Sequence, residues 1–105
     1  LIDIYLVNRG PNTENLAIDL TRKLRKINVI TELDISGSSF SKQFKKANRL
    51  KAKSVIIIGE EEAMNKEFVI RLFSDKQKDN KEKLISFEDN CELENWIKTN
   101  IRKGL

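Results

Sequence analysis

Residues 39–71 read SFSKQFKKANRLKAKSVIIIGEEEAMNKEFVIR, and the fold is decided in this stretch. Between Phe40 and Leu50 the apolar residues follow one another at offsets of four, three and three, which predicts an amphipathic helix. Residues 55–58 are a β-branched run that is too short for a helix and that ends at Gly59. Such a run is typical of a strand covered on both faces, as in a parallel sheet. The stretch therefore predicts a helix that leads into a buried strand.

The segments on either side complete an α/β pattern. Apolar periodicity predicts further helices around residues 16–27 and 93–101, and the predicted strands are residues 2–7, 29–34, 54–58, 67–73 and 83–87. Residues 59–66 are expected to form a turn, and residues 74–82 a charged loop that joins the last two strands as a hairpin. Right-handed crossovers place the first three strands in the order 2-1-3. We therefore expect a three-layer α/β/α fold with a five-stranded mixed sheet.

Size and composition place the chain among globular proteins. Its 105 residues suit a single domain over residues 1–105, and 39% are hydrophobic and 34% charged. No apolar run approaches the ~20 residues of a membrane span, so we expect no membrane partner. A strand is already under way at Leu1, which suggests a piece of a longer protein. The lone Cys91 has no disulfide partner, which favours a reducing compartment such as the cytoplasm.

The chain lacks residues that several kinds of catalytic chemistry require. The chain has no histidine, which excludes histidine bases and histidine-ligated metals. Glu60, Glu61 and Glu62 are candidate metal ligands or an acid/base pair, but we interpret them as solvated and expect neither a metal nor a catalytic site. No glycine-rich phosphate loop is present. A flavodoxin-like ligand binder would need such a loop after the first strand, where residues 8–11 are a poor match.

The placement of charge points to a polyanion partner. Residues 35–59 carry six basic residues and no acidic one, whereas residues 60–105 carry eleven acidic and nine basic residues. Four of the basic side chains share one face of the predicted helix: Lys42, Lys45, Lys46 and Arg49. They are candidates to hold RNA phosphates. The alternative is an ordinary solvated helix face.

The topology itself predicts where a ligand binds. Ligands of such sheets gather beyond the carboxyl ends of the parallel strands, which here are residues 8–9, 34–38 and 59–62. Carboxylates and guanidinium groups read the edges of unstacked bases. Glu62 and Arg71, across the connection between the third and fourth strands, are candidates for this role, and a mutual salt bridge is the alternative. We expect these residues to meet at the rim formed by the strand ends.

Four segments carry a family resemblance: ELDISG at residues 32–37, SKQFKKANRLKAK at 41–53, IIIGEEE at 56–62 and FVIRLF at 68–73. With the order of elements, they resemble the C-terminal anticodon-binding domain of histidyl-tRNA synthetases. That domain belongs to the fold shared by the class IIa synthetases for glycine, threonine and proline. The resemblance covers nearly the whole chain and is weakest after Phe73.

The resemblance implies roles for individual residues. Glu62 and Arg71 match positions that contact anticodon bases, and Lys45 matches a basic position near the anticodon stem or loop. The connection Ser36-Gly37-Ser38 matches a contacting loop, although the related threonine-specific domain has an asparagine at the position of Gly37. Weaker matches are Asn8, Arg9 and Glu60.

The resemblance also implies partners. The tRNA anticodon stem-loop would bind this chain, and a separate catalytic domain of the same protein would use ATP and Mg²⁺. No residue here matches that catalytic domain's motifs, so this chain by itself is not expected to adenylate histidine and needs no cofactor. The parent would be a homodimeric histidine–tRNA ligase of the cytoplasm. The alternative is a synthetase-like regulatory module without ligase activity, which senses uncharged tRNA or regulates histidine biosynthesis.

Overall fold

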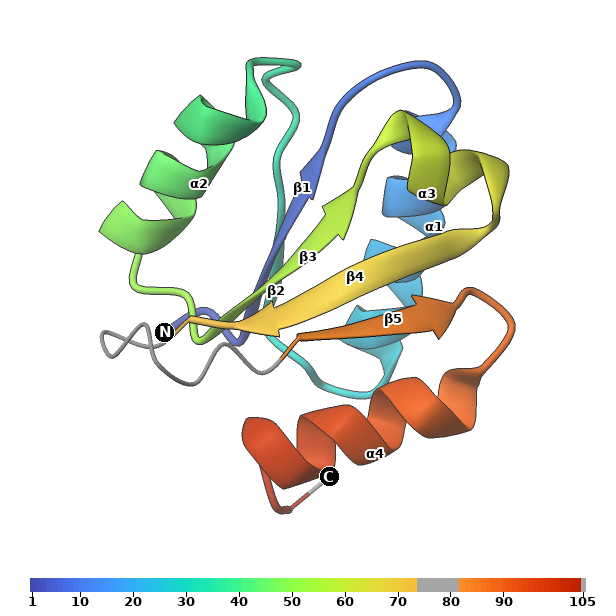
Figure 1. Cartoon of the computed structure of the whole chain (residues 1–105). Coiled ribbons are helices and arrows are strands. Elements are labelled where there is room, and N and C mark those ends of the chain that lie inside the picture. The colour runs from blue at the N-terminus through green and yellow to red at the C-terminus, as the bar shows by residue number, and fades with distance from the viewer. Residues whose placement is uncertain (74–81, 105) are drawn as a thin grey trace.

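The computed structural model describes residues 1–73 and 82–104. It contains five strands and four helices in the order β1, α1, β2, α2, β3, α3, β4, β5, α4 (Figure 1). The strands are β1 Ile4–Asn8, β2 Thr31–Leu33, β3 Ser54–Ile58, β4 Glu67–Leu72 and β5 Glu82–Ser86. The helices are α1 Thr13–Lys26, α2 Phe40–Arg49, α3 Glu60–Met64 and α4 Asn90–Asn100. The expected charged loop lies outside the described residues except for Glu82, which begins β5.

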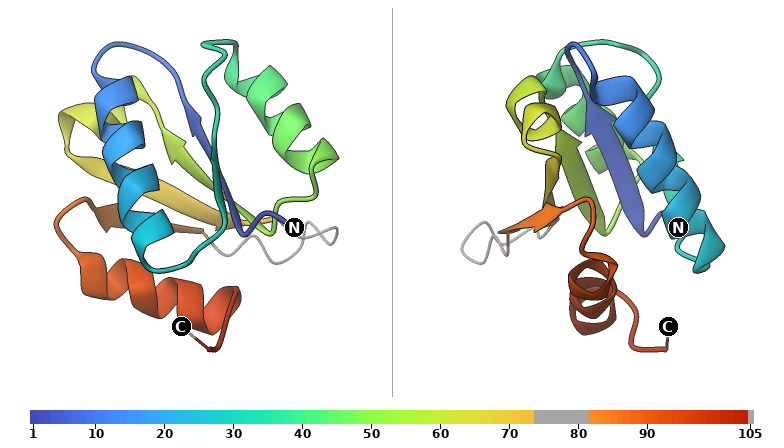
Figure 2. Two further views of the ribbon diagram at one scale, coloured as in Figure 1. Left: turned by 180° about the vertical axis from the view of Figure 1, so that it is seen from behind. Right: turned by 90° about the vertical axis from the view of Figure 1, so that its right-hand side faces the viewer.

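The sheet has the expected topology. Its strand order is β2-β1-β3-β4-β5, with β1 parallel to both β2 and β3. β4 pairs antiparallel with β3 and β5 antiparallel with β4, which makes the sheet mixed. The three-layer prediction is confirmed, because α1 and α4 cover one face and α2 lies on the other (Figure 2).

The two faces of the sheet are covered unequally. The larger hydrophobic cluster joins β1, β3, β4 and β5 to α1 and α4, and includes Leu24, Phe68 and Trp96. The smaller cluster lies under α2, where Ala47 packs with Tyr5 and Val55. Since α2 packs over β1 and β3, the same face of β4 and β5 has no helix above it among the described residues (Figures 1 and 2).

One predicted turn is a helix. Residues 60–64 form α3, which begins directly after Gly59. Its first turn carries three glutamates, and negative charge near a helix N-terminus is favourable. The side chain of Glu62 accepts a hydrogen bond from the Gly59 backbone N–H at 2.9 Å, which satisfies a donor at the helix start. Helix α2 begins as expected, with the Ser39 hydroxyl accepting from the Lys42 N–H.

Within the described residues, no helix is long and apolar enough to cross a membrane. The single cysteine, Cys91, lies exposed in the first turn of α4.

Candidate nucleic-acid interface

The rim formed by the ends of the parallel strands is closed by the chain's own hydrogen bonds. At the end of β1, the Asn8 side chain donates to the Asp34 backbone carbonyl at 2.9 Å. Gln43 reaches the same place from α2 and is only 1% exposed. Its Oε1 accepts from the Asn8 N–H, and its Nε2 donates to the carbonyls of Asn8 and Ser38. Gln43 therefore joins α2 to β1 and to the loop before the helix.

Asp34 fixes the other side of this rim. Its carboxylate accepts from the Tyr5 hydroxyl at 2.6 Å and from both the N–H and the hydroxyl of Ser36. Burial alone would raise the pKa of Asp34, but the hydrogen bonds from Ser36 and Tyr5 outweigh it and hold that pKa below its ordinary value. Burial, and then the bond to Asp34, raises the pKa of Tyr5. Tyr5 is fully buried, so it is a core residue here.

The loop of residues 35–38 follows directly after the buried Asp34. Ser36 and Ser38 share a hydrogen bond between their hydroxyls at 2.7 Å, and Gly37 has a positive φ of 68° that suits a residue without a side chain. Beside them, Ile35 is 89% exposed. The structure therefore presents Ser36-Gly37-Ser38 on a supported loop, and their contact with RNA stays a prediction.

The basic face of α2 is exposed as expected. Its cations follow the loop directly, because Ser39 ends the loop and caps the helix. All four are exposed: Lys42, Lys45, Lys46 and Arg49. Lys46 lies near enough to Asp34 to contribute to its lowered pKa. Helix α2 thus begins at the rim and carries positive charge along its exposed side.

Glu62 and Arg71 do not meet at the rim, which corrects the expected arrangement. Glu62 lies just beyond the carboxyl end of β3, bonded to Gly59. Arg71 pairs across the sheet with Val55, near the opposite end of β3. The mutual salt bridge is also absent, since Arg71 pairs instead with Glu82. The antiparallel direction of β4 carries Arg71 away from the strand ends.

Both residues nevertheless border the same side of the sheet. A Cβ atom placed on Gly59 would lie 2.7 Å from Glu62 Oε1 and 3.8 Å from the ring of Phe40. The rings of Phe40 and Phe44 have their centroids 6.3 Å apart, and the Arg71 guanidinium lies 5.9 Å from the Phe44 centroid. The rings of Phe40 and Phe44 therefore lie between Glu62 and Arg71.

Between these ends lies a surface that we call the open sheet face. It consists of Ile57 on β3, Val69 and Arg71 on β4, and Glu82 and Leu84 on β5, which the strand register places side by side. Leu84 is 55% exposed, whereas Phe68 and Ile85, on the opposite face, are buried. The basic helix α2 borders this surface through Phe40 and Phe44. An exposed apolar strip next to cations is suited to unstacked bases, whose faces are apolar and whose backbone is anionic.

Sequence reasoning overlooked several of these residues. The sequence pattern places Phe44 only among the apolar residues of the amphipathic helix, and it places Glu82 in a loop. Alternation along the last two strands was the available signal, since residues 69, 71, 82 and 84 share one face once the register is known. Gln43 and Asp34 carry no pattern that marks them, because their roles arise from contacts between distant segments.

The weaker candidates lie around the first strand. Asn8 is half-buried and bonded to Asp34, so it supports the rim. Arg9 and Glu60 are exposed. The Gly10 position packs against Glu60, because a Cβ there would lie 3.4 Å from Glu60 Cβ. A carboxylate beside the loop after β1 disfavours a nucleotide phosphate at that place.

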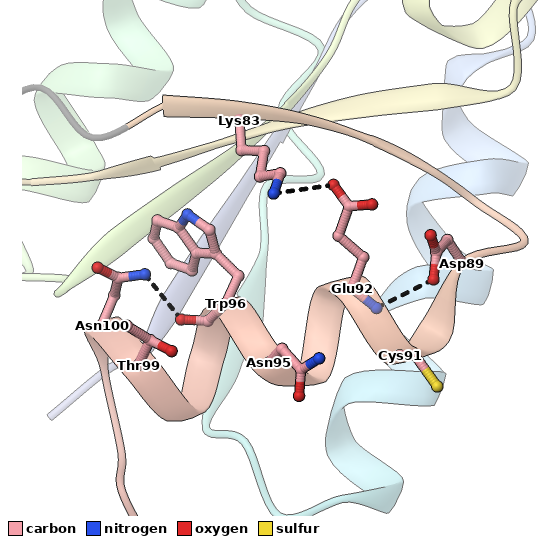
Figure 3. A pocket seen from close by; sticks show the side chains of 8 residues that line it. All are labelled: Lys83, Asp89, Cys91, Glu92, Asn95, Trp96, Thr99 and Asn100. Carbon is pink, nitrogen blue, oxygen red and sulfur yellow. Dashed lines mark hydrogen bonds and ion pairs between the residues drawn. The ribbon is translucent and has the colours of Figure 1, made fainter.

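A hollow lies beside α4, away from the rim and the open sheet face (Figure 3). Its charged groups serve the helix and the sheet: Lys83 pairs with Glu92 at 3.4 Å, and Asp89 accepts from the Glu92 N–H. The buried Trp96 lines this hollow and belongs to the hydrophobic core. Across the described residues, no group of three or more cysteine, aspartate or glutamate side chains is placed to hold a metal ion.

Comparison with known families matches the model of the anticodon binding domain to residues 3–98. Histidine–tRNA ligase of Prochlorococcus marinus strain MIT 9515 is 62% identical over 98 residues, which cover 93% of this chain and 23% of the relative. Histidine–tRNA ligase of Crocosphaera subtropica is 47% identical over 75 residues, 71% of this chain and 17% of the relative. The chain thus spans about a quarter or less of the length of these curated relatives.

Solved structures share the fold. Histidyl-tRNA synthetase of S. aureus superimposes with a TM-score of 0.72 over 88% of this chain and 26% of that one, at 24% identity. The RNA binding domain of threonyl-tRNA synthetase from Cryptosporidium parvum gives 0.79 over 94% of this chain and 23% of that one, at 18% identity.

Proposed function

The chain belongs to the anticodon-binding domain family, and from this premise we propose that it recognises the anticodon of a histidine tRNA. It would do so as one domain of a histidine–tRNA ligase, the activity named for its relatives. This chain contributes binding and positioning, and the chemistry belongs to the rest of the protein.

The open sheet face supports this proposal more than any other observation. Among the described residues, a part of the sheet that has no helix above it, where Leu84 is 55% exposed, lies next to a helix whose exposed side carries only cations among its charges. We assign the phosphates to that helix, through Lys42, Lys45, Lys46 and Arg49. Loop residues 36–38 would contact the nucleotides that pass α2.

The base edges would be read at the two ends of this surface. Arg71 offers parallel N–H donors, which suit a base with two neighbouring acceptors such as guanine. Glu62 offers a carboxylate oxygen to base N–H groups, while its Oε1 stays with Gly59. Phe40 and Phe44 lie between these ends, where an aromatic ring can support a stacked base.

The wider setting follows from the same premise. Activation of histidine with ATP and Mg²⁺ would belong to a separate catalytic domain of a homodimeric parent in the cytoplasm. The tRNA would connect the two domains, with its anticodon held here. The regulatory alternative has no observation in its favour, since the relatives reported above are named ligases.

A titration tests the proposal. This chain is mixed with an RNA hairpin that carries the anticodon GUG, which pairs with histidine codons, and with hairpins changed at each anticodon base in turn. We expect the GUG hairpin to bind more tightly than the changed hairpins, and binding of all of them to weaken as salt rises. Equal binding of every hairpin would contradict anticodon recognition. A salt-independent affinity would contradict the role of the basic helix.

A further inference from the structure

Arg71 is already engaged on the open sheet face. Its Nε and Nη2 donate to the same oxygen of Glu82, at 2.9 and 2.7 Å. The two residues are directly opposed on β4 and β5, so the sheet register itself brings them together. Glu82 therefore occupies the Nε–Nη2 edge of the guanidinium, one of the edges that present paired N–H donors to a base.

This ion pair is weak and accessible. The Arg71 and Glu82 side chains are 36% and 47% exposed. Exposed pairs of this kind contribute little to stability, because water solvates both partners and salt screens them. A ligand group with equally good acceptors can therefore replace Glu82 without disturbing the fold.

The charge of Glu82 also opposes the rest of the surface. Helix α2 carries cations and no carboxylate, and Arg71 lies over one of its rings. A carboxylate beside the single arginine of the open sheet face lowers the positive potential there and repels phosphate. Neither effect assists the binding of RNA in general.

We propose that Glu82 is an internal competitor for Arg71, which the RNA must displace in order to engage the Nε–Nη2 edge of the guanidinium. The inference rests on the proposed function. The group that displaces Glu82 is a base edge with two adjacent acceptors. Glu82 thus sets the affinity of the chain below the level that its cations alone would give, and the part of this effect that exceeds a general change in charge acts through Arg71.

Two neutral substitutions separate this role from a change in net charge. Glu82→Gln removes the competing charge, and Glu92→Gln is the matched control, because Glu92 is also a partly exposed glutamate in an ion pair but lies on α4. Affinity for the GUG hairpin is measured for both, in the wild-type background and with Arg71→Ala. Thermal unfolding of every variant shows that it is folded.

We expect Glu82→Gln to bind the GUG hairpin about two- to fivefold more tightly than the wild type, which is the range that an exposed ion pair allows. Glu92→Gln should change the affinity less. In the Arg71→Ala background the gain from Glu82→Gln should fall to that of the control, as in a double-mutant cycle whose two sites act through one contact.

Three results would overturn the inference. Glu82→Gln could bind no more tightly than Glu92→Gln, or its gain could persist without Arg71. It could also bind more weakly than the wild type, which would make Glu82 a direct contact of the RNA. Failure of the wild-type chain to distinguish GUG from changed hairpins would instead contradict the proposed function.

Discussion

The rim of the parallel strands and the open sheet face both carry polar side chains, but they use them in opposite ways. At the rim, Asp34 and Gln43 are almost fully buried, and the side chain of each makes three hydrogen bonds. On the open sheet face, Arg71 makes an accessible ion pair beside an exposed leucine. A buried polar group that lost its partners would destabilise the fold, so the polar side chains of the rim serve to stabilise it. The open sheet face can exchange its partners at little cost, which is what a binding surface requires.

The largest effect that this comparison predicts is on folding at the rim. Gln43→Ala should lower the free energy of unfolding by about 3 kcal/mol, because the backbone groups of Asn8 and Ser38 lose their partners in a buried place. Urea denaturation measures the change. Lys42→Ala, on the exposed side of the same helix, should change it by less than about 0.5 kcal/mol. Similar values for the two variants would remove the distinction between the regions.

The second prediction concerns the open sheet face. Arg71→Ala should cost roughly 1–3 kcal/mol of discrimination at one anticodon base, because paired donors to a base edge are lost. Its unfolding free energy should fall by less than about 1 kcal/mol, since the ion pair is exposed. Titration with matched and changed hairpins measures the first quantity. Equal loss for all hairpins would show that Arg71 holds phosphate and reads no base.

The third prediction uses the titration of the rim. The lowered pKa of Asp34 means that the unfolded chain binds this proton more readily than the folded chain, so stability should be lost as the pH falls below about 4. The raised pKa of Tyr5 has the opposite consequence, and stability should be lost as the pH rises above about 10. Unfolding curves at several pH values measure both.

Substitution of Asp34 and Tyr5 tests whether these two groups cause the losses of stability at acid and alkaline pH. Asp34→Asn should flatten the acid side of the profile and Tyr5→Phe the alkaline side, because each removes one titrating group from the buried contact. A profile unchanged by both would mean that other groups control the pH dependence.

The smallest effect is expected on the exposed helix face. Lys45→Ala should weaken binding of every hairpin about equally, by less than about 1 kcal/mol, and lower the salt slope by about one contact. Its effect on a single base change should be negligible. If Lys45→Ala altered discrimination at one base, the phosphate role of the basic helix would be wrong.

The parts of this molecule that were predictable are those set by local pattern. The β-branched run at residues 55–58 required a buried strand, and the 3.6-residue spacing between Phe40 and Leu50 required a helix. The helix at residues 60–64 was missed because its five residues are too few to show periodicity, and a capping bond from Glu62 stabilises its start.

The sequence predicted candidate residues for the site but not their geometry. Charge and resemblance pointed to the basic side chains of α2 and to the loop at residues 36–38, whose contact with RNA stays a prediction. The meeting of Glu62 and Arg71 was wrong, because a nine-residue separation does not reveal that β4 runs back along β3 and carries Arg71 to the far end. The sequence alone does not show that Glu82 lies opposite Arg71, because this depends on the pairing of β4 with β5.

The amino-acid sequence by itself determined the order of the five strands and the three longer helices, the strand order in the sheet and the cationic side of α2, because these depend on periodicity, connection handedness and residue type. Tertiary structure decided which polar groups remain accessible. Packing of α2 over β1 and β3 buries Gln43 and, among the described residues, leaves the same face of β4 and β5 without a helix, and only the strand register sets Glu82 against Arg71. Accessibility depends on contacts between segments far apart in the chain, and no local pattern records those contacts.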